Sequence, residues 1–404
     1  MSNIVIDEIE LENLRSGKPP LDRALLAEMT LGEEHWLDRF KEHYLYNYLA
    51  QGGSKVKVLV GRAGSGKTHL LRCVEQDARD LGYEVVYLSA PEMGKRLNDL
   101  PNLYRVMVEK IDKEKIIKGL CCRVARDLGY YQEHYDGSQP LLPILVEKEC
   151  HPVSEAKRLI RQAVGNTFRA LDAGPSFVAF CYNVVTSRMV TGNINTLNVA
   201  VKWLCGHNLE RHEKKTTGLY ERLQKSNARA WLNSLVQILK MAEMTGLVLM
   251  IDNLEIMTER LPNTKRFDYT RNAVKDTREL IRQFIDDVEL LPRFLLILAG
   301  RREIIEDEMR GLKSYDALWM RLQTGLIPSK EFNPYCDIVD VDAHLRVNGP
   351  DFPGKVAERL NQIFRTAGYK RKYKELPDLN LHSKLRAQVM ENALLVEKEA
   401  TDYE

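Results

Sequence analysis

The stretch KVKVLVGRAGSGKT, residues 55–68, decides the fold of this chain. Its apolar first half predicts a buried β-strand, and its second half matches the phosphate-loop pattern G-x-x-x-x-G-K-T. In such a loop, glycines let backbone N–H groups point at phosphate oxygens, and the N-terminus of the helix that follows adds positive potential. The alternative is a glycine-rich turn without a ligand, which would have to match all four fixed positions by chance. We therefore predict an α/β P-loop fold.

The residue types of the loop predict their roles. The Lys67 ammonium is expected to reach the β- and γ-phosphates of a nucleotide, and the Thr68 hydroxyl is expected to ligate Mg²⁺. ATP and Mg²⁺ are therefore the predicted ligands. The predicted nucleotide-binding residues of the loop and of the start of its helix are Gly61, Gly64, Ser65, Gly66, Lys67, Thr68 and His69.

A second apolar run, residues 246–252, ends in Asp252 and predicts the acidic partner of the loop. It is typical of a buried parallel strand, whose carboxyl end lies where ligands gather in open α/β folds. Asp252 is therefore predicted to hold the magnesium ion and to act in catalysis with Lys67. In many ATPases a glutamate comes next and polarises the attacking water, but here Asn253 follows and Glu255 is the nearest carboxylate. Three alternatives stay open: Glu255 replaces that base, a partner subunit supplies it, or the chain binds ATP tightly and hydrolyses it slowly.

Two arginines follow another short apolar run. The fourth expected strand ends in Arg301 and Arg302, so Arg301 is the predicted sensor of the γ-phosphate and Arg302 the second choice; the alternative is a solvated loop. A charged helical stretch, residues 303–322, comes next and carries Arg321 near its end. In oligomeric ATPases an arginine at this position reaches the neighbouring subunit's nucleotide, where it neutralises transition-state charge. The alternative for Arg321 is an ordinary surface or salt-bridged arginine. The further strands are expected at residues 83–89, 294–300 and 336–341.

The spacing of the two nucleotide motifs predicts an insertion. Lys67 and Asp252 are 185 residues apart, whereas a β-α-β unit on each side of one further strand needs only some tens. Residues 113–245 carry helix-period segments at 153–171, 177–189 and 219–241, which predict a helical subdomain. Residues 101–245 hold 21 Lys and Arg against 14 Asp and Glu, so this region is +7 and the remainder −5. The net charge of +2 therefore hides a polarised molecule.

Composition excludes several classes of protein. With 44% hydrophobic and 29% charged residues the chain has the composition of a soluble globular protein, and its longest apolar runs are far shorter than the roughly 20 residues that cross a membrane. The start has no basic segment followed by an apolar one, so no secretory signal is expected and the predicted location is the cytoplasm. Seven cysteines without Cys-x-x-Cys spacing argue against a disulfide framework and a zinc ribbon.

Basic clusters raise the possibility of a nucleic-acid partner. A basic helical surface beside an ATPase core often holds a nucleic-acid backbone through phosphate contacts. The two densest clusters are residues 211–215 and 370–374. The second cluster has a central tyrosine, Tyr373, which is able to stack on a base. The alternative is a solvated charged face. The candidate DNA-contacting residues are Lys214, Lys215, Lys370, Arg371, Lys372 and Lys374.

The motifs described above, in their order along the chain, resemble those of a known family. The order of phosphate loop, late acidic strand, arginine-tipped strand and following arginine resembles the AAA+ division, in the branch near the origin-recognition ATPases. More narrowly, the chain is similar to the ATP-binding proteins of bacterial BREX phage-defence loci. The segments that carry the likeness are residues 14–20, Phe40 with residues 52–58, residues 100–105, and the stretch from residues 249–252 to residues 299–302.

This resemblance implies an architecture. It implies a parallel sheet in the order 5-1-4-3-2, an N-terminal helical cap on the base side of the nucleotide, and a helical C-terminal lid. Residues 379–386 look like the start of a lid helix that places a second sensor, Arg386, over the nucleotide, although the usual proline is missing; the alternative is that Arg386 faces solvent. The expected divisions are a cap at 1–50, an ATPase core at 51–112 and 246–345, the insertion at 113–245 and a lid at 346–404.

The resemblance also implies a function. We expect an ATPase that acts as a switch or motor in antiviral defence, assembles into an oligomer, and binds DNA, a helicase or another defence protein. The alternative is a nucleotide-dependent signalling adaptor that binds protein partners only. A metabolite kinase is a third class, but no acceptor site can be identified in the sequence.

Overall fold

The structure of the chain, a computed structural model, describes residues 5–93, 97–131, 133–148, 150–287, 290–323, 333–380 and 382–398. The first four residues of the expected cap and residues 399–404 of the expected lid lie outside these ranges. Among the described residues, no helix is long and apolar enough to cross a bilayer. All seven cysteines are free thiols.

Five parallel strands form the central sheet. Their order is β2-β3-β4-β1-β5, which is the expected order read from the opposite edge. β3 and β4 are buried along their whole length, as the apolar runs predicted for strands covered on both faces. Because all five run the same way, the residues that follow β1, β3 and β4 meet at one edge. The strands are β1 (Lys55–Val60), β2 (Glu84–Ser89), β3 (Leu247–Asp252), β4 (Phe294–Gly300) and β5 (Ile338–Asp340).

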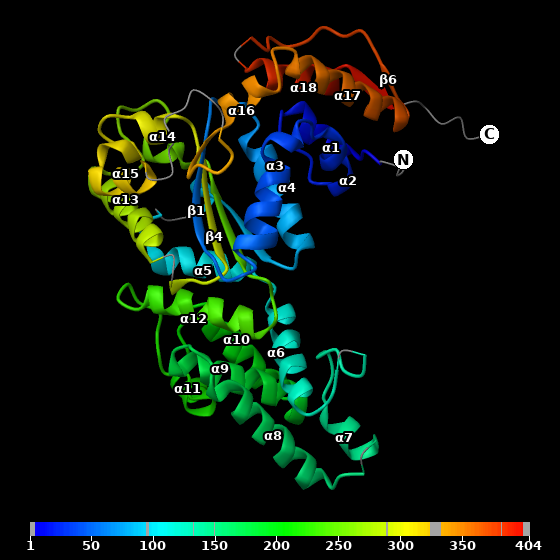
Figure 1. Ribbon diagram of the computed structural model, residues 1–404, viewed down its shortest axis with the longest axis vertical. Helices are drawn as coiled ribbons and strands as arrows, with labels where there is room; N and C mark the ends of the chain where they lie inside the picture. The colour runs from blue at the N-terminus through cyan, green and yellow to red at the C-terminus, as the bar shows by residue number, and fades with distance from the viewer. Residues whose placement is uncertain are drawn as a thin grey trace, which may run out of the picture.

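Helices cover both faces of this sheet (Figure 1). On one face, α4 (Lys67–Asp80) packs with α3 (Leu37–Phe40) and the π-helical turn η2 (Lys41–Tyr48). The other face is covered by α5 (Leu100–Lys110) and α13 (Arg271–Asp286), and its apolar core continues without a break into the helical insertion. The insertion is thus joined to the sheet by packing as well as by its two chain connections.

The N-terminal helices belong to two different cores. Trp36 and Phe40 pack against the sheet, whereas Leu11 and Leu14 of the first helix pack against the C-terminal helices. The cap and the lid therefore share one apolar core, as Figure 1 shows at the top of the molecule. Its elements are α1 (Glu8–Arg15), α2 (Arg23–Met29), α17 (Phe352–Thr366), α18 (Lys384–Leu394) and the antiparallel strands β6 (Tyr369–Arg371) and β7 (Val396–Lys398). The two strands were not predicted.

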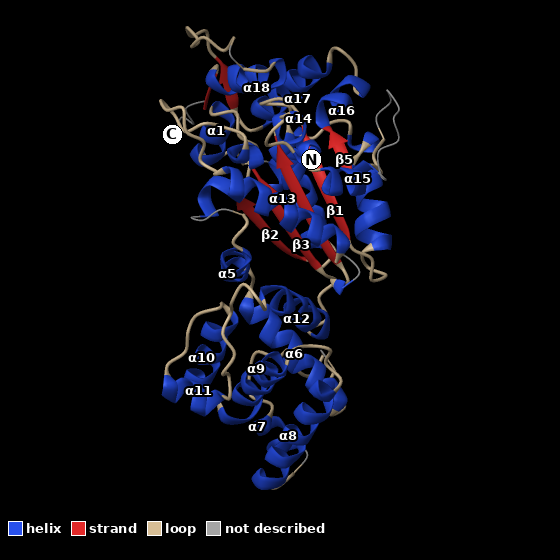
Figure 2. Ribbon diagram, turned by 90° about the vertical axis from the view of Figure 1, so that its left-hand side faces the viewer, coloured by secondary structure: helices blue, strands red, loops and turns tan. Residues whose placement is uncertain are grey.

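The insertion lies at the opposite end of the long axis from the lid (Figures 1 and 2). A cluster of five aromatic rings, Tyr104, Phe177, Phe180, Trp203 and Trp231, fills its centre. Its elements are α6 (Lys113–Asp127), α7 (Leu142–Lys148), α8 (Val153–Arg169), α9 (Pro175–Thr186), the π-helical turn η4 (Ser187–Thr191), α10 (Ile194–Leu204), α11 (Arg211–Thr217) and α12 (Ala228–Met241).

Two predicted helices were too long. The helix expected at 219–241 begins only at Ala228, because the Asn227 amide bonds to the Arg222 carbonyl and to the Gln224 N–H and holds that segment in a loop. The stretch 303–322 is split into α14 (Glu303–Glu306), the 3-10 turn η7 (Leu312–Ser314) and α15 (Asp316–Gln323). There the Asp307 carboxylate accepts the Met309 and Arg310 N–H groups and turns the chain.

Candidate functional site

The loop after β1 wraps around an open space at the carboxyl edge of the sheet. Gly64 and Gly66 have φ values of +73° and +93°, a left-handed backbone that glycine adopts without strain. Gly61 has no room for a side chain, because a Cβ would lie 2.6 Å from Ser65 Oγ. The Lys67 ammonium donates to the Gly61 and Arg62 carbonyls at 3.0 and 2.9 Å. Burial lowers the pKa of Lys67, while nearby Glu255 opposes that shift.

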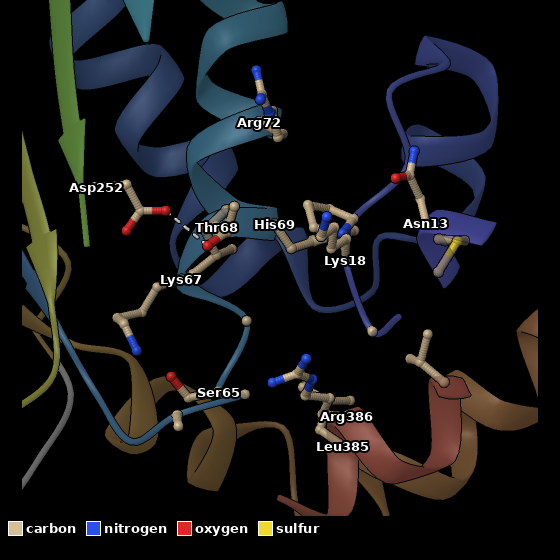
Figure 3. A pocket seen from close by; sticks show the side chains of 18 of the residues that line it. Asn13, Lys18, Ser65, Lys67, Thr68, His69, Arg72, Asp252, Leu385 and Arg386 are labelled. Carbon is tan, nitrogen blue, oxygen red and sulfur yellow. Dashed lines mark hydrogen bonds between the residues drawn. The ribbon is translucent and has the colours of Figure 1, made fainter. Parts of the chain in front are cut away.

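The carboxylate of Asp252 lies opposite the loop, at the end of β3. Its Oδ2 accepts a hydrogen bond from the Thr68 hydroxyl at 2.8 Å (Figure 3). The same oxygen accepts the Tyr87 hydroxyl at 2.8 Å, and Oδ1 accepts the Asn253 N–H at 2.8 Å. The Arg72 guanidinium lies 4.0 Å from the centre of the Tyr87 ring and holds the ring in place. Asp252 is 2% exposed, so these three donors fix its orientation.

Two carboxylates hold Arg301 at the end of β4. The Arg301 N–H donates to Glu255 Oε2 at 3.3 Å, its Nε lies 3.6 Å from Glu255 Oε1, and its Nη1 donates to Glu259 at 2.5 Å. Burial raises the pKa of Glu255, whereas Arg301 and Lys67 act to lower it. The half-buried Glu255 carboxylate thus contacts the sensor candidate, and the charge of the loop lysine also acts on it.

Asn253 is turned away from this group. It has a left-handed backbone (φ 60°), which asparagine tolerates better than most residues, and its amide donates to Ser89 Oγ on β2 at 3.1 Å. A longer acid at this position would therefore start out directed toward β2. Of the two positions considered for the catalytic base, 253 and 255, only position 255 carries a carboxylate. Glu255 lines the same cavity as Lys67.

Arg302 has a different environment from Arg301. Its guanidinium donates to Asp340 of β5 at 2.5 and 2.6 Å and to Asp342 at 2.9 Å. Asp342, in α16 (Val341–Val347), also accepts the Arg62 N–H at 3.1 Å. Arg302 thus holds the ends of β4 and β5 and the loop together. It does not line the cavity described below.

The C-terminal helix touches the phosphate loop directly. Ser383 caps the N-terminus of α18, and its hydroxyl donates to the Gly64 carbonyl at 2.7 Å. Arg386, one turn later, donates to the Ser16 carbonyl at 2.9 Å. A Cβ on Gly64 would lie 2.9 Å from that of Arg386. Arg386 therefore lies at the loop, and the lid and cap meet there.

His69 connects α4 to the cap. Its Nε2 lies 3.0 Å from the hydroxyl of Thr30, which follows α2. Partial burial lowers the pKa of His69 to about 4, so the ring is neutral at physiological pH. His69 would therefore contact a nucleotide, as predicted, through an uncharged side chain.

These groups surround a single cavity of about 640 Å³. One end is polar and contains the loop, Asp252, Glu255 and Arg301. The other end lies between the cap and the lid and is largely apolar. Its apolar lining residues are Leu21, Met29, Leu31, Leu345, Phe352, Val356, Leu385 and Val389.

The chemistry of this lining fits a nucleotide and a magnesium ion. Within the described part of the chain, four buried polar atoms along it have no hydrogen-bond partner: Asn13 Nδ2, Ser65 Oγ, Arg72 Nε and Arg386 Nε. Three of the four are hydrogen-bond donors only: the Nε–H groups of the two arginines and the N–H₂ group of Asn13. An electron-rich ligand would satisfy them. The Thr68 and Asp252 oxygens are the ligand type that Mg²⁺ prefers. Among the described residues, no group of three His, Cys, Asp or Glu side chains could hold a metal.

The remaining predicted residues lie outside the cavity. Arg321 of α15 is ion-paired with Asp286 of α13 and donates to the Ala317 carbonyl at 2.6 Å. The two basic clusters lie at opposite ends of the molecule, one on α11 and the other at β6 (Figure 1). In the second cluster, Arg371 lies 3.7 Å from Glu391 and Lys372 is paired with Glu397. The candidates concerned are Lys214, Lys215, Lys370, Arg371, Lys372 and Lys374.

Three contacts of this site were missed in the sequence. Tyr87 lies in β2 two residues before Ser89, which is opposite Asp252 in the β2–β3 register, and the sequence alone does not reveal this pairing or the hydrogen bond from the Tyr87 hydroxyl to Asp252. Ser383 was recognised only as part of a lid segment, although a serine three residues before Arg386 is a typical helix cap. Asn13 lies in a helix that had no motif.

One of three comparisons with known proteins found a match. No match to a curated protein and none to a solved structure was found. The family described as "BREX system ATP-binding protein BrxC/D" matches residues 8–393, nearly the whole chain. The match includes the cap, the phosphate loop, the insertion and most of the lid. The chain therefore belongs to the family of BREX system ATP-binding proteins BrxC/D.

Proposed function

We propose that this chain is an ATPase of BREX phage defence, in which ATP binding joins the sheet, the cap and the lid into one switch. The observation that carries the proposal is the composition of the cavity. The phosphate loop, the Thr68–Asp252 hydrogen bond, Arg301 and Arg386 line one space, although they come from four distant parts of the chain. A ligand that contacts all of them changes how these parts are held together.

In this proposal each group has a defined task. The backbone N–H groups of residues 61–68 and the Lys67 ammonium bind the phosphates, and Lys67 exchanges its two carbonyl acceptors for phosphate oxygens. Thr68 and Asp252 hold the magnesium ion, which, when bound, neutralises phosphate charge. Arg301 and Arg386 sense the nucleotide from the β4 and lid sides. The apolar end of the cavity takes the base.

Hydrolysis requires a base, and Glu255 is the residue we assign. It is a half-buried carboxylate that lines the same cavity as Lys67, and the charges of the two groups interact, whereas the Asn253 amide donates to Ser89. Arg301 occupies Glu255 in the present arrangement. Activity therefore requires that Arg301 moves toward the nucleotide and leaves the carboxylate available to a water molecule. Slow unaided turnover is the consequence.

Arg321 is proposed to act in trans. It lies outside the cavity of its own chain, beside α13, and 37% of its side chain is accessible. An arginine finger placed in a neighbour's site neutralises transition-state charge and raises turnover strongly. To do so, Arg321 has to exchange Asp286 for phosphate. The proposed protein is therefore a homo-oligomer in its active form, located in the cytoplasm.

The proposed partner is DNA, a helicase or another defence protein. The +7 charge of residues 101–245 supports a nucleic-acid contact at the insertion, with Lys214 and Lys215 on α11 as its candidates. Neutralisation of Arg371 and Lys372 by Glu391 and Glu397 weakens the case for the second cluster. That neutralisation favours the alternative, an adaptor that binds protein partners only, for the lid end.

A gel-shift series separates the two functions. DNA binding is measured at 50 and 200 mM salt, with and without ATP, for the wild type and for a Lys214→Glu/Lys215→Glu variant. Salt-sensitive binding that this variant loses supports the DNA function. Absence of binding at 50 mM salt leaves the adaptor. A Lys370→Glu/Lys374→Glu variant tests the second cluster by the same charge reversal at the opposite end of the molecule.

A further inference from the structure

The apolar end of the cavity contains one amide side chain, that of Asn13 in α1. Lys18, Thr30 and His344 also line the cavity, while the apolar walls of this end are formed by Met29 and Leu31 from the cap and Phe352 and Val356 from α17. Such walls bind a flat ring by burying its faces. They do not distinguish one ring from another, because discrimination requires hydrogen bonds to the edge of the ring.

The Asn13 amide is held in place and lacks a partner. Its Nδ2 is buried and donates to no other described residue. The backbone carbonyl of Asn13 accepts the Lys18 N–H at 2.8 Å, which closes the turn after α1. Leu11 and Leu14, on either side in sequence, are packed in the core shared by cap and lid. A buried N–H₂ without an acceptor costs roughly 1 to 3 kcal/mol, so this donor is suited to a ligand.

Asn13 lies at the end of the cavity away from the phosphate site. Figure 3 shows the Asn13 and Lys67 side chains at opposite sides, with His69 and Lys18 between them. A nucleotide whose phosphates occupy the loop thus extends its base toward Asn13.

We propose that Asn13 recognises the edge of the purine base and gives the site its preference for adenine. The inference rests on the proposed binding of ATP in this cavity. An amide carries a donor and an acceptor side by side, and adenine presents a ring nitrogen that accepts and an exocyclic amine that donates. Asparagine makes this paired contact with adenine in DNA recognition. Asn13 is therefore the specificity-determining residue of the base end.

The test is equilibrium binding of four probes: ATP, GTP, purine ribonucleoside triphosphate, which lacks the exocyclic amine, and inorganic tripolyphosphate. Asn13→Ala should weaken ATP roughly tenfold, as expected for a lost buried hydrogen bond. It should affect the purine analogue less, and it should leave tripolyphosphate unchanged. Asn13→Asp, which only accepts hydrogen bonds, should lower the ratio of ATP to GTP affinity at least tenfold. Glu12→Ala, on the exposed side of the same helix, is the matched control.

Each other outcome contradicts a defined statement. If both variants keep the ATP affinity and the ATP-to-GTP ratio within twofold of wild type, Asn13 does not read the base. If Asn13→Ala weakens the binding of ATP and of tripolyphosphate equally, the substitution changes the shape of the cavity, and the inference is wrong. If the folded wild type binds tripolyphosphate and binds none of the nucleoside triphosphates more tightly than tripolyphosphate, the base adds nothing to binding. That result overturns the inference and leaves the proposed function standing. A folded wild type that binds none of the four probes overturns the proposed function as well.

Discussion

Replacing Tyr87 with phenylalanine removes one of the two hydroxyl groups that hold the Asp252 carboxylate. The Tyr87 hydroxyl and the Thr68 hydroxyl each donate to the same oxygen at 2.8 Å. A hydrogen bond to a charged group is worth about 1.5 to 3 kcal/mol. Since partners of metal-holding carboxylates influence metal affinity by roughly 10- to 100-fold, we expect Tyr87→Phe to raise the Mg²⁺ concentration for half-maximal ATP binding by that factor. The ring stays under Arg72, so the fold is retained.

The assay is ATP binding by titration calorimetry over a range of Mg²⁺ concentrations and in excess EDTA. The variant should shift the Mg²⁺ dependence and leave metal-free ATP binding unchanged. Tyr83→Phe is the matched control, because the Tyr83 hydroxyl donates to the Leu45 carbonyl at 2.6 Å in the core and is expected to affect stability alone. A half-saturating Mg²⁺ concentration within twofold of wild type would refute the reasoning. Equal losses with Mg²⁺ and with EDTA would also contradict it.

Three further substitutions test the catalytic end and the lid. Glu255→Gln should reduce ATP turnover at least 100-fold and keep ATP binding. In the wild type, burial raises the pKa of Glu255, so turnover should fall as pH decreases through that raised pKa. The variant should lack this fall. Unchanged turnover would exclude Glu255 as the base. Asn253→Glu should not raise turnover and should lower the free energy of unfolding by about 1 kcal/mol, because residue 253 has a left-handed backbone; a clear rise in turnover would show that its side chain does reach the water. Ser383→Ala should destabilise α18 by about 1 kcal/mol and speed hydrogen exchange over residues 384–394, and unchanged exchange would contradict the role of this cap.

The sheet and the loop could be predicted because their signals are local. β3 and β4 are almost continuous apolar runs, β1 and β2 are rich in β-branched and other apolar residues, and the loop follows β1 directly. Asp252 was identified for the same reason, since it ends such a run. The split of residues 303–322 was missed because the turn depends on two backbone N–H groups bonding to Asp307, while the charge pattern alone is compatible with one helix.

The rest of the site depends on contacts between distant segments. Ser383 and Gly64 are 319 positions apart, and the two tyrosine and threonine donors to Asp252 are 165 and 184 positions from it. No local pattern encodes such pairs. Asn13 was equally invisible, because one asparagine in a polar helix gives no signal until a cavity is seen around it. Residue chemistry therefore identified the phosphate end, and packing was needed to identify the base end.

The central claim is that residues 61–68 bind ATP in the cavity shared by sheet, cap and lid. Equilibrium binding of ATP with Mg²⁺ to the wild type and to Lys67→Ala tests it most directly, with the unfolding temperature of both proteins measured in parallel. We predict one ATP per chain for the wild type and at least 100-fold weaker binding for a folded Lys67→Ala variant. A folded variant that binds ATP within threefold of wild type would contradict the claim.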